Sequence, residues 1–168
     1  SWSPDGKWFT LEFIGNRHDP YSDIGMVSAQ GGKIINLTNS GYTSGSPRWV
    51  LDGNAILFIT ERYGMRAHAS WGSLNDVMLV FMNQDAYDKF RLSKEDYELQ
   101  KELEKEQKNT TEAKKNDKKK GDNKEKSEEK KEEKVKDIVV ELNNIEDRIV
   151  RLTPNSSDLG SAIITKDG

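Results

Sequence analysis

Two short sequence markers recur along this chain of 168 residues in the same order and at matching distances. They are an Asp-Gly pair and a Leu-Thr pair, found at Asp5-Gly6, Asp52-Gly53, Asp167-Gly168, Leu37-Thr38 and Leu152-Thr153. Each Leu-Thr pair begins 15 positions before an Asp-Gly pair, although the Leu-Thr pairs lie 115 positions apart and the first two Asp-Gly pairs only 47. Markers that keep their spacing in this way predict a repeat of about 47 residues, with about 68 more inserted into the second copy.

Strand patterns follow each of the first two Asp-Gly pairs. Residues 7–13 place apolar side chains at every second position, which predicts a half-buried strand. Residues 55–59 (AILFI) are continuously apolar, as in a strand covered on both faces. Later in the first copy, residues 23–27 and 33–37 flank Gly31-Gly32 and predict a second hairpin.

The second copy is expected to contain the same hairpin after the inserted segment. Residues 137–142 and 148–152 are interpreted as its two strands, with the turn at 143–147. Residues 76–82 (DVMLVFM) also predict a strand, which is placed where the insertion begins.

Four short strands in each copy are typical of a β-propeller blade. The predicted fold is therefore all-β, a partial β-propeller of about two four-stranded antiparallel blades with a helical or disordered charged insertion. The first blade and the start of the second occupy residues 1–82, the insertion residues 83–136, and the rest of the second blade with the start of the next residues 137–168. Since a propeller closes with about 4 to 8 blades, further blades are expected outside this sequence.

The insertion begins with a helix signal and continues into a charged stretch. Ser93 with Asp96 predicts an N-cap and a helix that starts at Lys94, with Leu92 and Tyr97 spaced for a hydrophobic staple. Residues 108–136 are almost entirely Lys, Glu, Asp and Asn, which favours a solvated spacer. An electrostatic tether and a lone charged helix are the alternatives.

Composition excludes several classes of function. The net charge is −3 and cysteine is absent, so a basic nucleic-acid surface, thiolate metal sites and a cysteine nucleophile are not expected. No apolar run approaches the ~18 residues of a membrane span, and residues 1–8 lack the pattern of a signal region.

No catalytic, cofactor-binding or metal-binding residue is predicted. His18 and His68 are the histidines of the chain, and neither lies at metal-ligating spacing. A Gly-x-Ser-x-Gly elbow and Gly-rich phosphate or dinucleotide loops are absent. The Asp residues of the Asp-Gly pairs are interpreted as turn formers, and Trp2 and Trp49, at equivalent repeat positions, as packing residues.

The candidate recognition element is the loop of residues 62–75 (RYGMRAHASWGSLN). It is 6 residues longer than the matching connection of the first copy. Its candidate recognition residues are Tyr63, Met65, His68 and Trp71. Packing against a neighbouring blade is the alternative to a binding role for this loop.

Several segments carry a resemblance to known families. Residues 1–7 (SWSPDGK) and 23–38 (DIGMVSAQGGKIINLT) are similar to the repeat of TolB-type and related WD-like propellers. The chain as a whole resembles the N-terminal propeller of bacterial tricorn-protease homologues. That resemblance rests on PRWVLDG (47–53), RYGMRAHASWGS (62–73), AYDKFRLSKEDYE (86–98), the Lys/Glu-rich spacer and IEDRIVRLT (145–153).

The resemblance implies a noncatalytic propeller that gates or steers peptides or unfolded polypeptides toward a downstream core with a PDZ-like domain and a serine nucleophile. The implied partners are such substrates, the remaining blades and the peptidase core, with homo-oligomerisation left open, and without cofactor, nucleic acid or membrane span. The implied location is periplasmic or otherwise extracytoplasmic. The alternatives are a TolB-like binding module without peptidase activity and the propeller of a prolyl-oligopeptidase-like hydrolase.

Overall fold

The computed structural model of the chain describes residues 1–15, 21–66, 71–116 and 136–165. The chain divides into two compact units, Ser1–Tyr87 with Val135–Gly168 and, separately, Asp88–Lys134. The strands all lie in the first unit. They are β1 (Trp8–Phe13), β2 (Asp23–Ser28), β3 (Ile35–Asn36), β4 (Ser44–Val50), β5 (Ala55–Thr60), β6 (Asp76–Phe81) and β7 (Ile149–Arg151). The helices are α1 (Gln84–Phe90), α2 (Lys94–Asn116) and the short 3-10 helices η1 (Leu51–Gly53) and η3 (Ile145–Arg148).

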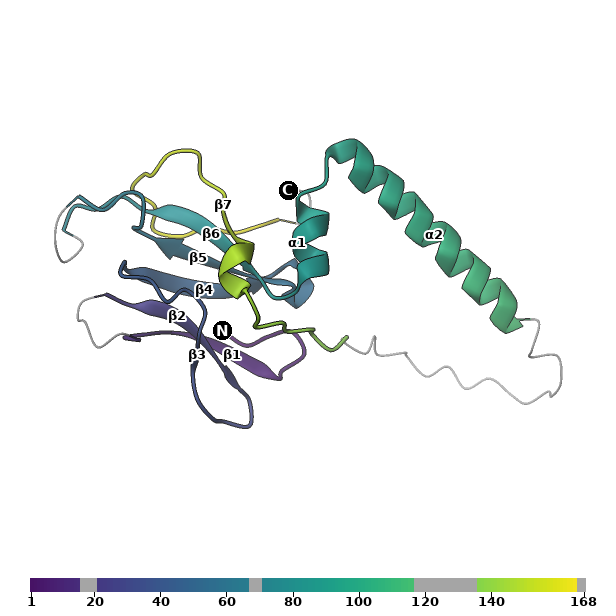
Figure 1. The fold of residues 1–168 in the computed structure, drawn as a ribbon, viewed down its shortest axis with the longest axis horizontal. Helices are drawn as coiled ribbons and strands as arrows, with labels where there is room; N and C mark the ends of the chain where they lie inside the picture. The colour runs from purple at the N-terminus through teal and green to yellow at the C-terminus, as the bar shows by residue number, and fades with distance from the viewer. Residues whose placement is uncertain (16–20, 67–70, 117–135, 166–168) are drawn as a thin grey trace. The chain divides into compact units, whose positions relative to one another are not determined.

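The strands form two antiparallel sheets, which confirms the all-β prediction and is consistent with part of a propeller. Sheet A has the order β1-β2-β3 and sheet B the order β4-β5-β6-β7, and Figure 1 shows the two sheets stacked. Sheet B has the predicted four strands, whereas sheet A has three. In sheet B the first strand, β4, pairs with β5. In sheet A the equivalent position next to β1 holds only one isolated β-bridge, between Trp2 and Phe9.

The two sheets are copies of one unit, in the same register. Strand β5 begins 47 positions after β1 and has the same length of 6 residues. Trp2 bridges Phe9, and the equivalent Trp49 pairs with Ile56. The first residue of β2, Asp23, pairs with the last residue of β1, and Asp76 pairs in the same way with the last residue of β5. The repeat inferred from the Asp-Gly and Leu-Thr markers is therefore present in three dimensions.

The assignment of the third strand in the second copy was wrong. Strand β6 pairs with β5 over its whole length and occupies the place of β2. Residues 137–142 form no strand, and in this stretch the backbone N–H of Glu141 donates to Met82 O at 2.7 Å. The physical reason is burial: every side chain of β6 is buried, whereas Val139 is 60% exposed. The insertion thus separates β6 from β7.

The buried side chain of Arg148 links the segments on either side of the insertion, which are the end of β6 and the residues just before β7. Arg148 is 4% exposed and donates from Nε to Phe81 O at 3.3 Å and from Nη1 to Asn143 O at 3.1 Å. Its Nη2 donates to Glu141 O. In the first copy the same connection is a tight turn at Gly31 and Gly32, both with positive φ. Carbonyl groups left unpaired by the interrupted hairpin are satisfied here by the guanidinium.

Sheet B is buried on both of its faces. One face packs on sheet A in a core of nine buried residues, Ile24, Met26, Leu37, Ile56, Phe58, Met78, Val80, Met82 and Ile145. The other face holds a second buried cluster, Ala55, Leu57, Val77, Leu79 and Phe81. That cluster is covered by Ala86 and Tyr87 of α1 and by the extended residues Leu159, Ala162 and Ile164. Cover on two faces explains why β5 and β6 are continuously apolar.

The helix of the second unit begins where the sequence predicted. α2 starts at Lys94; the N–H of Asp96 donates to Ser93 Oγ at 3.1 Å, and that hydroxyl donates to the Asp96 carboxylate at 2.7 Å. Lys89 pairs with Glu104 at 3.0 Å. α2 continues to Asn116, into the stretch predicted as a spacer. None of the described helices is long and apolar enough to cross a membrane.

Replacing a leucine by alanine is expected to destabilise the first unit more than the second. Leu79, in the centre of sheet B, is 0% exposed, and Leu79→Ala should lower the free energy of unfolding by about 3 kcal/mol through lost burial and a cavity. Leu99 on α2 is 57% exposed, and Leu99→Ala should change the free energy of unfolding by less than about 0.5 kcal/mol. Urea denaturation followed by tryptophan fluorescence measures both; equal losses would contradict this account of the core.

Candidate functional site

The predicted recognition loop leaves sheet B between β5 and β6, at the end opposite the Asp-Gly turns. Two of its aromatic side chains are solvent-exposed, Tyr63 at 53% and Trp71 at 79%. Met65 is half-buried, and His68 lies outside the described residues. The base of the loop is closed by hydrogen bonds from Gly64 N to Glu61 O and from Leu74 N to Gly64 O, both at 2.9 Å.

Tyr63 is held by a cation from a distant part of the chain. The guanidinium carbon of Arg151, on β7, lies 4.6 Å from the centroid of the Tyr63 ring, and that of Arg62 lies 5.8 Å away. Both distances are within the range of a cation–π interaction. The structure therefore brings Tyr63 together with Arg151, a residue that sequence reasoning did not select.

The orientation of Arg151 is set by a buried carboxylate at the start of β6. Asp76 is 0% exposed, and its Oδ1 accepts from Arg151 Nε at 2.9 Å and Nη2 at 2.8 Å. Thr153 Oγ1 donates to the same oxygen at 2.7 Å, and Ser156 Oγ donates to Oδ2 at 2.7 Å. Such charge-assisted bonds fix geometry as well as energy, so Asp76 holds Arg151 in place against the Tyr63 ring.

The first copy contains this carboxylate without the cation. Thr38 Oγ1 donates to Asp23 Oδ1 at 2.8 Å, and Asn36 Nδ2 donates to Asp23 Oδ2 at 2.9 Å. Asn36 occupies the position equivalent to Arg151 in the repeat. The Asp–Thr pair is therefore a structural element of both copies, and it accounts for the threonine of the Leu-Thr marker. The arginine and its contact with Tyr63 belong to the second copy.

The environment of Asp76 favours its charged form. Burial by itself raises the pKa of this carboxyl group, but hydrogen bonds from Ser156, Thr153 and Arg151, together with the Arg151 charge, outweigh burial and lower the pKa below its ordinary value of 3.8. A lowered pKa in the folded state means that this group stabilises the fold above that value and ceases to do so as the pH falls below it.

Of the other residues considered from sequence, Asp5, Trp2 and Trp49 have structural contacts. Asp5 accepts hydrogen bonds from Ser3 Oγ at 2.6 Å and from Lys7 N at 3.1 Å within its turn. Trp49 packs against the core between the sheets, whereas Trp2 is 58% exposed and contacts Phe9 edge-on at 5.1 Å. His18 and Asp167 lie outside the described residues. Within the described part of the chain, no group of three or more His, Asp or Glu side chains could hold a metal ion.

Comparison with known proteins gives one informative match. A stretch of 56 residues, 33% of this chain, is 39% identical to "Uncharacterized peptidase YuxL" of Bacillus subtilis (strain 168). The chain is similar to a peptidase over one third of its length. The matched stretch is 8% of that protein, so the chain corresponds to a small part of it. No family model and no solved structure matches the chain.

Replacing the buried carboxylate should reveal its role in stability. Asp76→Asn leaves the Arg151 charge without its partner and should lower the free energy of unfolding by about 3 kcal/mol at neutral pH. The difference from the unmodified protein should narrow as the pH falls below 3.8, because protonated Asp76 has lost the same interactions. Thermal unfolding monitored by circular dichroism across pH measures this.

Asp52→Asn is the matched control, because it makes the same chemical change at an exposed turn residue. Asp52 has φ 53°, a conformation that asparagine tolerates, so this variant should unfold like the unmodified protein at every pH. A pH-independent loss for Asp76→Asn would contradict the charge argument.

Proposed function

We propose that the chain is the noncatalytic β-propeller segment of a tricorn-like serine peptidase, which gates or steers peptide substrates toward a catalytic core elsewhere in the same protein. The observation that carries the proposal is the similarity to a protein named as a peptidase over one third of the chain. The repeated, stacked sheets support a propeller, and the ordered series of sequence motifs supports the tricorn type.

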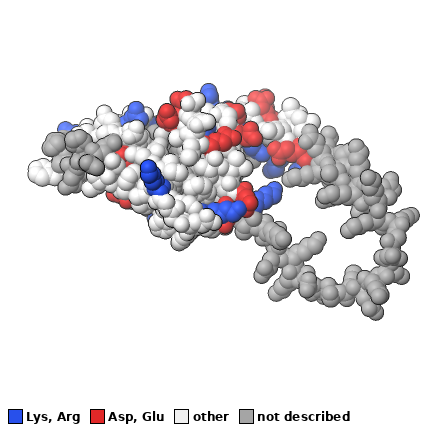
Figure 2. Space-filling view, turned by 60° about the horizontal axis from the view of Figure 1, so that its bottom comes forward, with Lys and Arg blue, Asp and Glu red and all other residues white. Residues whose placement is uncertain are grey.

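The loop between β5 and β6 is the surface through which substrate contact is proposed. Exposed aromatic rings provide large contact areas with few rotatable bonds, and Tyr63 is already held by Arg151. A side chain ordered in advance loses less entropy on binding. Figure 2 shows acidic and basic side chains interspersed on the face in view, a distribution suited to polypeptides and not to a phosphate backbone.

The proposed partners are unfolded or peptide substrates, further blades of the propeller and the peptidase core, and homo-oligomerisation is included in the proposal. A periplasmic or otherwise extracytoplasmic location goes with the tricorn-like assignment. Fractionation of cells with an antibody against the chain tests the location, and recovery in the cytoplasm would contradict it.

The continuation of the reading frame tests the peptidase assignment. A PDZ-like segment and a serine peptidase core after residue 168 would support the proposal. A frame that ends with the last blade would instead support a TolB-like binding module, and a Gly-x-Ser-x-Gly elbow would support a prolyl-oligopeptidase-like hydrolase.

Truncation of the exposed tryptophan should weaken peptide binding. Trp71→Ala is expected to lower the affinity for a fluorescein-labelled casein peptide about tenfold, which is typical for loss of an exposed aromatic anchor. Fluorescence anisotropy measures the affinity, and circular dichroism checks that the fold is intact.

Trp2→Ala provides the matched control, because Trp2 is also exposed, at 58%, and lies near the opposite end of the strands. The Trp2→Ala variant should bind the casein peptide with the same affinity as the unmodified protein. An unchanged affinity in folded Trp71→Ala would remove the loop from the proposed binding surface.

A further inference from the structure

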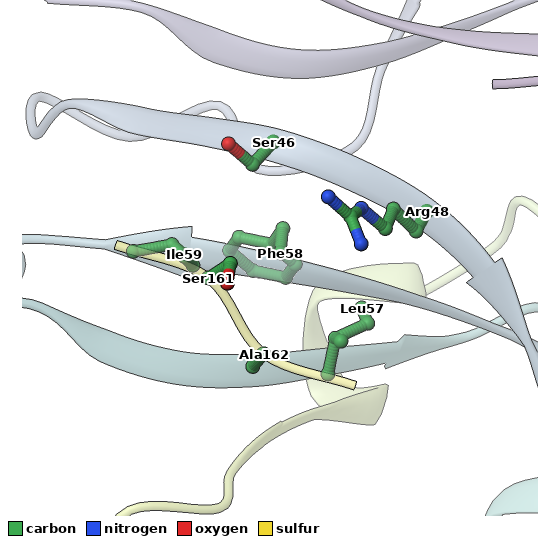
Figure 3. A pocket seen from close by; sticks show the side chains of 7 residues that line it. All are labelled: Ser46, Arg48, Leu57, Phe58, Ile59, Ser161 and Ala162. Carbon is green, nitrogen blue, oxygen red and sulfur yellow. The ribbon is translucent and has the colours of Figure 1, made fainter. Parts of the chain in front are cut away.

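The pairing between β4 and β5 is interrupted in the middle and is regular again at the end that carries the recognition loop. The register shifts between Gly45 and Arg48, and the small hollow beside this shift has room for little more than a water molecule (Figure 3). Past the shift, Ser44 pairs with Thr60, the last residue of β5. The ladder is therefore intact up to the point where the chain leaves the sheet, which is Glu61.

Glu61 is a buried acidic residue, 2% exposed, that changes the direction of the chain. Its backbone N–H donates to Thr43 O at 3.1 Å, as the next rung of the ladder would. Its own carbonyl group turns away and accepts from Gly64 N at 2.9 Å, which begins the loop. The Thr43 N–H donates instead to the Glu61 carboxylate, at 3.2 Å. One side chain thus takes the place of a backbone carbonyl group where strand becomes loop.

The bonds that follow close the base of the loop. Leu74 N donates to Gly64 O at 2.9 Å, and Asn75 exchanges hydrogen bonds with Ser157 at 2.7 and 3.0 Å. A Cβ atom on Gly64 would collide with the Leu74 carbonyl oxygen, so only glycine allows the two arms of the loop to approach this closely. Tyr63 precedes Gly64 and therefore lies in the turn that these bonds hold.

Neither stability nor the repeat explains the acid at this position. Among the described residues no cation pairs with the Glu61 carboxylate, whereas Asp76 is paired with Arg151. A buried carboxylate without a cation is costly. The equivalent residue of the first copy is Ile14, which is 51% exposed, and the connection there is 6 residues shorter. The acid accompanies the longer loop and costs stability, which is typical of functional positions.

We propose that Glu61 is a positioning residue of the recognition loop, which holds Tyr63 and the arm that carries Trp71 ready for a polypeptide. This role rests on the proposed function and names the residue that orders its binding surface. Glu61 acts through the loop, because its own side chain is buried. A loop that is ordered in advance loses less conformational entropy when it binds.

The test replaces Glu61 in the whole chain by Gln, which keeps an oxygen acceptor for Thr43 N, and by Met, which has a similar volume and accepts only weakly. In Glu61→Met, NMR hydrogen exchange should show the amides of Gly64 and Leu74 exchanging about tenfold faster, with those of β6 unchanged. Its affinity for the fluorescein-labelled casein peptide should fall about fivefold. Its urea midpoint should change little, because relief of the buried charge offsets the Thr43 N–H left unpaired. Glu61→Gln should behave like the unmodified protein.

Glu146→Met is the matched control, because it makes the same change at an exposed residue of η3, near the opposite end of β6. It should alter neither exchange nor affinity. A lowered urea midpoint with faster exchange in every strand of Glu61→Met would make Glu61 a purely structural residue and overturn the proposal. Unchanged exchange at Gly64 and Leu74, faster exchange without loss of affinity, or a Gln variant that behaves like the Met variant would overturn it as well. Failure of the unmodified protein to bind the peptide would overturn the proposed function, and the exchange rates would still decide whether Glu61 fixes the loop.

Discussion

Burial of sheet B on both faces is the constraint on which the rest of this structure depends. A sheet with apolar side chains on each face has to be covered twice, and here sheet A covers one face while α1 and residues 159–164 cover the other. Strands β5 and β6 supply all five residues of the second cluster and four of the nine residues of the core between the sheets. The loop after β5 and the insertion after β6 both extend from these two strands.

A buried carboxylate completes each copy of the unit. Asp23 and Asp76 stand at the start of equivalent strands, and each accepts a hydrogen bond from the threonine that follows the last strand of its sheet. These bonds link the start of β2 to the segment after β3, and the start of β6 to the segment after β7. Arg148 has a related role in the second copy, because it satisfies carbonyl groups on both sides of the insertion.

Differences between the two copies point to function more clearly than their similarities. Arg151 replaces Asn36 and orders Tyr63, and the loop after β5 is longer than its counterpart. Arg151 adds a cation that pairs with Asp76 and contacts Tyr63, and the longer loop carries the exposed ring of Trp71. These differences are the basis of the proposed polypeptide recognition, together with the similarity to a protein named as a peptidase.

The sequence by itself determined the repeat, its length, the all-β class, the helix start at Lys94 and the exposed aromatic loop, because these depend on local spacing and turn chemistry. It misplaced the third strand of the second copy: residues 137–142 resemble a strand locally, and only the pairing of β6 along β5 shows which segment the sheet accepts. The roles of Asp76, Arg148 and Arg151 were likewise decided by tertiary structure, since Arg151 binds Asp76 across 75 positions and Arg148 binds Phe81 O across 67 positions. Local patterns predict which segments can become strands, whereas burial and hydrogen bonding between distant residues decide which segments pair and which charges they hold in place.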